Sequence, residues 1–581
     1  MFLPTTQTEV RDLGWDALDV ILVTGDSYID APSIGVAVIG KVLANAGFRV
    51  GIIAQPDPSS DQDIQRLGEP VLFWGVTGGS VDSMVANWTA TGKKRQKDDY
   101  TPGGVNNRRP DRALIVYANL IRQYYKNTAP IVLGGIEASL RRVAHYDFWS
   151  NTIRRSILFD AKADFLLYGM AEHSVVELAR RLQNGNDPEG IRGLCHIAGT
   201  RPPECVELPS YKDCVKNKDT FARMFLLFYR NNDPVTAAPL AQQQDTRYLI
   251  QNPPPACLSQ KELDAVHALD YERALHPFYQ MQGTVRALDT IAFSIATHRG
   301  CYGECNFCAI AVHQGRQVSW RSKSSILAEA RKMAAHPGFK GTISDVGGPT
   351  ANMYGIECDR KTTKGGCPDK RCLFPAPCKS LPIDHGPQIS LLRDLRKISG
   401  IKKVVIASGI RHDMVLADRE NGWRYLEDVI RHHVSGQMKI APEHSEAHVL
   451  AKMGKPGPEA VLAFKQRFDR MTKKAHLKQF LTYYLIAAHP GCTEKDMAAL
   501  RNFALKNLHL LPEQVQVFTP TPSTWSSLMY WTEKDPFTGA PCFVETHVRA
   551  KERQKQIITG RSAKKPIKRH STEKKANQTE G

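Results

Sequence analysis

The sequence contains no apolar run approaching the ~20 residues that a membrane-spanning helix needs. Its first residues, Met1–Glu9, lack the basic and apolar regions of a signal peptide. We therefore expect a cytoplasmic protein with no membrane partner. The thirteen cysteines form an odd number and gather in local groups, which argues against a disulfide framework and favours metal ligation in a reducing compartment.

A GxGxxG loop is also missing, so a dinucleotide-binding domain has little support. The net charge of +18 is uneven, because residues 549–581 hold eleven Lys/Arg against three Glu. We expect residues 531–581 to form a basic, largely disordered tail. A second basic stretch, at 92–112, is expected to be a long loop. Either stretch could contact the phosphates of a nucleic acid, or could be solvated charge without a specific partner.

Three cysteines form a CxxxCxxC triplet: Cys301, Cys305 and Cys308. The apolar segment before them, 291–297, is expected to be a buried strand, so the triplet lies in a loop at its carboxyl end. A [4Fe–4S] cluster normally takes four thiolates, and three thiolates in one short loop leave the fourth iron open to a substrate or cofactor. The alternative is a zinc knuckle that lacks one ligand.

The first 202 residues alternate short apolar runs with helical patterns. The expected strands lie at 19–24, 50–54, 71–75, 130–133 and 163–168, with a helix at 37–46. This alternation predicts an α/β domain with a doubly wound parallel sheet that binds ligands at the carboxyl ends of its strands. The prolines at 253–255 indicate a connector, which we expect to span residues 203–284.

Residues 18–190 resemble the cobalamin-binding domain, of flavodoxin-like fold, that precedes the barrel in many radical enzymes. In that family a DxHxxG loop supplies the histidine that ligates cobalt, whereas this chain has Pro32 at the matching position of the loop Asp30–Gly35. Thr77 falls near the family's hydroxyl position, and Gly134-Gly135 matches its glycine pair. The resemblance therefore implies that cobalamin is doubtful. The domain either binds it without a protein ligand or has kept the fold and lost the cofactor.

Between residues 285 and 530, six apolar segments each end in a turn that contains cysteine, glycine, proline or polar residues. The expected strands are 291–297, 341–345, 403–407, 437–440, 480–487 and 514–518. Barrel enzymes place catalysis at the carboxyl ends of their strands, because those ends converge on one mouth. We therefore expect a partial, TIM-like (β/α)6 barrel with the cysteine triplet at its mouth.

The triplet, with Phe307 before its last cysteine, and these strand-end motifs resemble the radical S-adenosylmethionine (SAM) superfamily and, over residues 13–530, its YgiQ family. The closest stretches are 23–30, 134–142, 345–354, 403–409 and 439–444. The resemblance implies a [4Fe–4S] cluster on the triplet, with SAM on the open iron. It also implies a 5′-deoxyadenosyl radical that abstracts hydrogen from a substrate, and an electron donor such as flavodoxin or ferredoxin. The family has no established substrate.

The resemblance also suggests which residues contact SAM. Gly347 and Gly348 would let backbone approach its methionine amino group, and Phe307 would pack near its adenine. Ser408 and Glu443 would bind its ribose or carboxylate, or else act as local caps. Arg411 would pair with the SAM carboxylate, or else form a surface ion pair.

A second cysteine group lies in an inserted loop at 358–378: Cys358, Cys367, Cys372 and Cys378. Four thiolates suit a closed zinc site or an auxiliary [4Fe–4S] cluster, and unligated thiols are the alternative. The paired CxxC of zinc ribbons is missing, so the spacing favours neither metal.

Two other functions compete with a radical SAM enzyme. A non-catalytic iron–sulfur redox protein is disfavoured, because an open iron is a liability for an electron carrier. A zinc-containing nucleic-acid-binding protein draws support from the second cysteine group and the basic charge. RNA is a weaker candidate partner, suggested by the charge.

Overall fold

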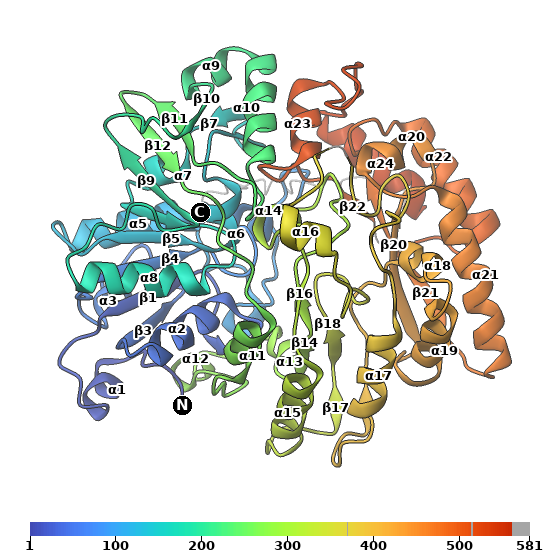
Figure 1. Ribbon diagram of the computed structural model, residues 1–581, viewed down its shortest axis with the longest axis horizontal. Helices are drawn as coiled ribbons and strands as arrows, with labels where there is room; N and C mark the ends of the chain where they lie inside the picture. The colour runs from blue at the N-terminus through green and yellow to red at the C-terminus, as the bar shows by residue number, and fades with distance from the viewer. Residues whose placement is uncertain (369, 513–514, 561–581) are drawn as a thin grey trace, which may run out of the picture.

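The N-terminal part of the protein is built around one nine-stranded sheet. The computed structural model describes residues 1–368, 370–512 and 515–560 (Figure 1). Five parallel strands form one side of this sheet, in the order β3–β1–β4–β5–β8. Their bounds are β1 Val20–Thr24, β3 Val50–Ala54, β4 Phe73–Thr77, β5 Ile131–Gly134 and β8 Phe165–Leu167. Counted along the chain this order is 2-1-3-4-5, the flavodoxin-like winding, so the predicted parallel α/β sheet is confirmed.

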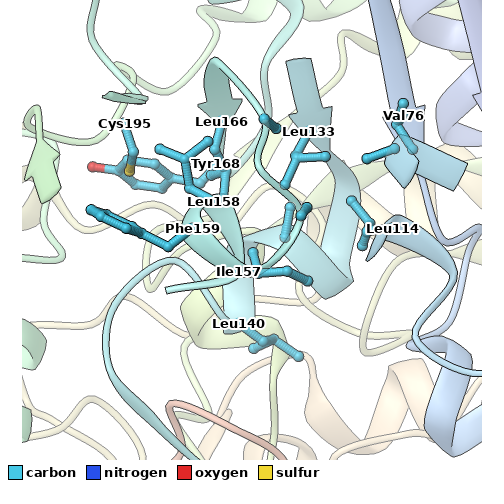
Figure 2. Packing of buried hydrophobic residues seen from close by; sticks show 14 of the residues in the cluster. Val76, Leu114, Leu133, Leu140, Ile157, Leu158, Phe159, Leu166, Tyr168 and Cys195 are labelled. Atoms are coloured by element: carbon cyan, nitrogen blue, oxygen red, sulfur yellow. The ribbon is translucent and has the colours of Figure 1, made fainter. Parts of the chain in front are cut away.

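Helices cover both faces of these strands. Helices α2 (Gly35–Asn45) and α8 (Glu172–Gln183) pack on one face, and α5 (Ala113–Tyr124) packs on the other. Strand β1 is buried at every position, as expected for a strand with two covered faces. Figure 2 shows the core on the α5 face of the sheet, where Leu133 and Leu166 lie among apolar side chains. Cys195 belongs to the same core and is completely buried, so it is a structural thiol.

The expected connector is wrong for most of its length, because residues 206–251 extend the same sheet. Strands β9 (Leu194–Ala198), β12 (Arg247–Gln251), β11 (Leu240–Gln244) and β10 (Val206–Leu208) follow β8 in that order. The polar sequence of β11 hid this strand. Gln242 and Gln244 are fully buried, and their amide oxygens accept hydrogen bonds from Ala144 N (2.9 Å) and Ser156 N (2.8 Å). Buried amides here satisfy loop backbone that would otherwise be unpaired.

Apart from a short antiparallel pair, β15 (His298–Arg299) with β16 (Ser319–Trp320), the described strands of the second half pair in parallel and in chain order. The strands are β14 Ser294–Ala296, β17 Thr342–Ile343, β18 Asp345–Gly347, β19 Lys403–Val404, β20 Gln437–Glu443, β21 Phe480–Ala487 and β22 Gln516–Val517. Strand β14 pairs with β18, β17 with β19, β20 with β21, and β21 with β22. A bridge between Ile410 and Ile440 links the β19 region to β20. All six expected strand segments are thus present as neighbours.

An outer layer of helices packs on these strands around a second large core (Figure 1). Its members include α15 Lys323–Ala334, α17 Gly386–Leu395, α19 Gly422–His432 and α21 Pro458–Lys474. The short helix α14 (Ile310–His313) lies between the two halves of the molecule. Among the described residues, no helix combines the length and apolarity needed to cross a bilayer.

The expected disordered tail is wrong for residues 531–560, which the structure describes. Helix α24 (Val548–Thr559) packs on α22 (Glu494–Phe503), and the buried Gln554 accepts a hydrogen bond from Ala488 N (2.9 Å). The side chain of Lys551 is buried and donates to Tyr530 Oη (2.9 Å). Apolar residues at helical spacing therefore order a segment that its charge made look solvated. Residues 561–581 lie outside the described part of the chain.

The basic stretch 92–112 is also partly buried. Arg109 is 5% exposed, and its guanidinium pairs with Asp26 (2.5 Å) and Asp98 (3.1 Å) at the carboxyl end of β1. Lys93 remains exposed and pairs with Glu552 of α24 (2.9 Å). Arg109 is therefore an internal anchor and is unavailable to nucleic acid.

Candidate functional site

The cysteine triplet follows β14 and ends at α14, as the sequence predicts. The three cysteine residues are half-buried, and their loop is held by backbone and side-chain contacts to sulfur. Gly303 N donates to Cys301 Sγ (3.3 Å), and Thr350 Oγ1 lies 3.6 Å from the same sulfur. Burial raises the pKa of Cys308 to about 12, so this thiol holds its proton until a metal displaces it.

The triplet thiols are not gathered as they would be around a single zinc ion. A tetrahedral ion with Zn–S bonds of about 2.3 Å holds its sulfurs about 3.8 Å apart. Among the described residues, the three triplet thiols do not form a group whose ligand atoms all lie within 4.8 Å. Wider separation suits thiolates that bind different irons of one cluster.

The glycine pair lies on the strand beside the triplet. Gly347 O accepts from Thr297 N (2.7 Å), which fixes β18 against the residue that follows β14. A Cβ on Gly348 would lie 2.6 Å from Nε2 of His298, so glycine is needed for this imidazole to fit. Gly348 therefore packs against the ring of His298, a neighbour that the sequence did not suggest.

Ser408 and Glu443 both lie at strand ends of the second half. Ser408 donates through Oγ to the carboxylate of Asp345, and its backbone N donates to Asp345 Oδ1 (3.1 Å). The hydroxyl and the backbone N–H of Ser408 are thus both engaged by Asp345. Glu443 is 6% exposed and has a backbone φ of +69°, and burial raises its pKa; Lys455 Nζ is 3.7 Å from its carboxylate.

Arg411 pairs with a buried carboxylate of its own turn. It is 7% exposed, and Asp413 occupies its Nε and Nη2 as a bidentate partner, with Nε–Oδ1 at 2.8 Å. Arg411 therefore does not form a surface ion pair. The Nε and Nη2 atoms of its guanidinium are already engaged by the carboxylate two residues away. Its remaining Nη1 donates to Cys305 Sγ at 3.5 Å.

Phe307 packs against both large cores and meets the ring of His489 edge-on, with the centroids 6.2 Å apart. The Nε2 atom of His489 in turn forms a hydrogen bond with Ser526 Oγ (2.7 Å). Phe307 is thus held at the end of β21, on the same side of the strands as the triplet.

The second cysteine group lies against the triplet loop. Cys358, Cys372 and Cys378 pack in a small cluster with Tyr302, and Cys367 is not a member of it. Lys361, in helix α16 (Asp359–Lys364), lies 3.7 Å from Glu304 of the triplet loop. Within the described ranges, no three of these thiols gather within 4.8 Å, so a closed single-ion site is not formed.

A cavity of about 430 Å³ lies between the two halves of the protein. Its inner part is apolar and runs between the sheet and helices α2 and α8, past Leu22, Val132 and Val175. Its mouth is lined from the second half by His298, Arg299, Gly348, Pro349 and His313. The positions that carry the cobalamin-domain resemblance, Pro32, Thr77, Gly134 and Gly135, all line it.

Two buried polar atoms at this mouth have no hydrogen-bond partner: Glu172 Oε2 and His298 Nε2. The other carboxylate oxygen of Glu172 pairs with Arg299. Thr297 Oγ1 donates to Gly347 O (3.2 Å) and therefore accepts from His298 Nδ1 (2.8 Å), which leaves the lone pair on Nε2. Unpaired buried acceptors are costly, so both atoms indicate a ligand that brings N–H or O–H donors.

Comparison with known proteins identifies the chain as a radical SAM protein. The family described as "Radical SAM N-terminal" matches residues 2–294. A UPF0313 protein of Fusobacterium nucleatum is 55% identical, covering 96% of this chain and 98% of its own. One from Thermotoga maritima is 49% identical over the same shares. The chain belongs to the YgiQ/UPF0313 family.

Among solved structures, the radical SAM methyltransferase TsrM from Kitasatospora setae, with cobalamin and a [4Fe–4S] cluster bound, aligns with a TM-score of 0.51. The match covers 88% of this chain and 78% of TsrM at 15% identity. At that identity the likeness establishes a shared fold.

Buried imidazoles near the site predict acid sensitivity. Burial lowers the pKa of His298 and His313 from 6.5 to about 4, so both rings are neutral at pH 7. Between pH 6.5 and 4 the unfolded chain binds protons that the folded protein does not bind. The free energy of unfolding therefore falls as the pH falls, by up to about 3 kcal/mol per ring. Thermal melts over this range should show the loss. His313→Gln should flatten the slope, whereas His509→Asn, at an exposed histidine, should leave it unchanged; equal slopes in all three proteins would contradict this.

Proposed function

We propose that this protein is a radical SAM enzyme whose triplet, Cys301, Cys305 and Cys308, holds a [4Fe–4S] cluster. The observation that carries the proposal is the position of these thiols, at the end of β14 and beside the glycine pair that ends β18. When bound, the cluster and SAM supply a 5′-deoxyadenosyl radical after one-electron reduction. We take the parallel strands of the second half as the partial (β/α)6 barrel that surrounds this chemistry. The substrate is unassigned, and the electron donor is of the flavodoxin or ferredoxin class.

The protein's own residues would bind SAM and exclude water. Gly347 offers backbone to the methionine amino group, because no side chain blocks its approach. Phe307 provides an apolar surface for the adenine. Glu443, buried with a raised pKa, accepts a ribose hydroxyl hydrogen bond, while Ser408 supports that wall through Asp345.

For the second cysteine group we propose an auxiliary iron–sulfur cluster rather than zinc. No three of these thiols lie mutually within 4.8 Å among the described residues, a spread that suits several irons better than one ion. The contact between Lys361 and Glu304 would couple this loop to the triplet loop.

A second candidate function is cobalamin-dependent methyl transfer, with cobalamin in the cavity between the halves. Three observations favour it: the apolar inner slot, the unpaired acceptors Glu172 Oε2 and His298 Nε2, and the cobalamin bound by the similarly folded TsrM. The amide side chains of a corrin carry N–H donors suited to those acceptors. The loop Asp30–Gly35 offers no histidine, so cobalt would have no ligand from it.

The competing functions have less support. A plain electron carrier would leave the ligand cavity beside the triplet without a use. A zinc-containing nucleic-acid-binding protein would need a zinc site, and its basic loop is anchored internally through Arg109. RNA as a substrate is supported by net charge alone.

The first test is radical formation. Anaerobically reconstituted, reduced protein should convert SAM to 5′-deoxyadenosine and methionine, measured by chromatography. Cys301→Ala and Cys308→Ala should abolish both products and most cluster absorbance, because two thiolates hold the cluster poorly. Cys205→Ala removes a buried thiol at the far edge of the sheet and should retain both. Product from Cys301→Ala equal to that of wild type would overturn the proposal.

The auxiliary cluster predicts a metal count. Reconstituted protein should hold clearly more iron than the ~4 atoms of one cluster. Cys358→Ser and Cys372→Ser should remove the excess and keep the triplet cluster, with Cys205→Ser as the matched control. Iron near ~4 in all proteins, or zinc that disappears in Cys358→Ser, would contradict it.

Cobalamin binding predicts retention of the cofactor. Protein incubated with hydroxocobalamin and desalted should keep its visible absorbance. Ile39→Trp, on α2 at the cavity wall, should reduce retention by filling the slot. Ile115→Trp makes the same change on α5, at the opposite face of the sheet, and should keep it. No retention by wild type with an intact cluster would reject cobalamin and leave the cavity to the substrate.

A further inference from the structure

Arg411 is a charged side chain that contacts the cysteine triplet. Its Nη1 donates to Cys305 Sγ at 3.5 Å, and a Cβ on Gly303 would lie 2.9 Å from the same nitrogen. Glycine at position 303 therefore lets the guanidinium approach the loop closely. The neighbouring sulfur, Cys301 Sγ, receives a backbone N–H from Gly303 (3.3 Å) instead.

A buried polar network fixes the position of Arg411. Its backbone N donates to Asn352 Oδ1 (2.8 Å), and its carbonyl accepts from Asn352 Nδ2 (3.1 Å). Asn352 also contacts His385 Nε2 (3.1 Å), whose Nδ1 lies 2.7 Å from Asp418 Oδ2. All three of these side chains are less than 5% exposed. A satisfied network of this kind holds the backbone in one place.

The guanidinium carries its charge permanently. Asp413 binds it through two hydrogen bonds and raises the pKa of Arg411 further above its usual range, and the arginine lowers the pKa of Asp413. The pair is neutral as a whole, but its positive end points to the sulfur and its negative end points away. In a buried site such an oriented pair produces a field that favours negative charge at the sulfur.

We propose that the Arg411–Asp413 pair sets the reduction potential of the triplet cluster, with Arg411 as a positioning and tuning residue that stabilises the reduced form. This rests on the proposed function, because it requires the cluster on Cys301, Cys305 and Cys308. The step is the transfer of one electron from an external reductant to the oxidised cluster, [4Fe–4S]2+ to [4Fe–4S]+. N–H donors and positive charge at cluster sulfurs raise the potential for this step.

The two members of the pair should act in opposite directions. Arg411→Gln removes the charge and should lower the potential, so that the ratio of reduced to oxidised cluster at a fixed potential falls about tenfold, equivalent to 59 mV for one electron. Asp413→Asn leaves the guanidinium without its counter-charge and should raise the potential. Arg411→Lys keeps the charge but loses the fork and should lie between wild type and Arg411→Gln.

The experiment is a redox titration of the reconstituted full-length protein without SAM, followed by the electron paramagnetic resonance signal of the reduced cluster. Iron content is measured for every variant. Arg396→Gln is the matched control, because it breaks a similar pair, with Asp428, on the outer helices. Its potential should equal that of wild type.

The outcomes separate this inference from the proposed function. Absence of any cluster in wild type would remove the proposed function itself. A normal cluster in all proteins with unchanged potentials would overturn the tuning role, as would shifts of the same sign in Arg411→Gln and Asp413→Asn. Opposite shifts, with Arg411→Lys between wild type and Arg411→Gln, would establish it.

Discussion

The site depends on two contacts between the halves of the protein, one on each side of the cysteine triplet. On one side of the triplet, Arg299 pairs with Glu172 at the start of α8. On the other, His313 Nδ1 lies 2.9 Å from Ser139 Oγ in the first half. Both contacts are part-buried, and the loop between them cannot move without breaking a charge pair or a hydrogen bond. They thereby hold the triplet loop beside the cavity, which Arg299 and His313 line.

The histidines around the cavity mouth and the triplet are neutral, and the arginines there are paired with carboxylates. His298 and His313 are neutral there because burial lowers their pKa to about 4. Arg299 is matched by Glu172, and Arg411 by Asp413. Two acceptors, Glu172 Oε2 and His298 Nε2, stay unpaired. The pattern suits a ligand rich in donors beside a cluster whose charge is balanced by one oriented ion pair.

Much of the fold and the placement of the triplet could be predicted from the sequence, because apolar runs and strand-end motifs are local signals. The strands at 206–251 were missed, since Gln242 and Gln244 are buried by pairing with backbone rather than by apolar character. The contacts of Arg411 with Asp413 and with the sulfur of Cys305 could not be predicted, because both depend on how a turn folds. The cavity joins residues more than 250 positions apart, from Leu22 to Gly348, so no sequence spacing could show it.

The most direct measurement is the electron paramagnetic resonance spectrum of the reduced cluster before and after SAM is added. An iron without a protein ligand should take SAM as a new ligand, so the g-values should change on titration and the change should saturate. The same titration with S-adenosylhomocysteine or with methionine alone calibrates that response. A fully formed, reduced cluster whose spectrum is unaffected by SAM would contradict the account.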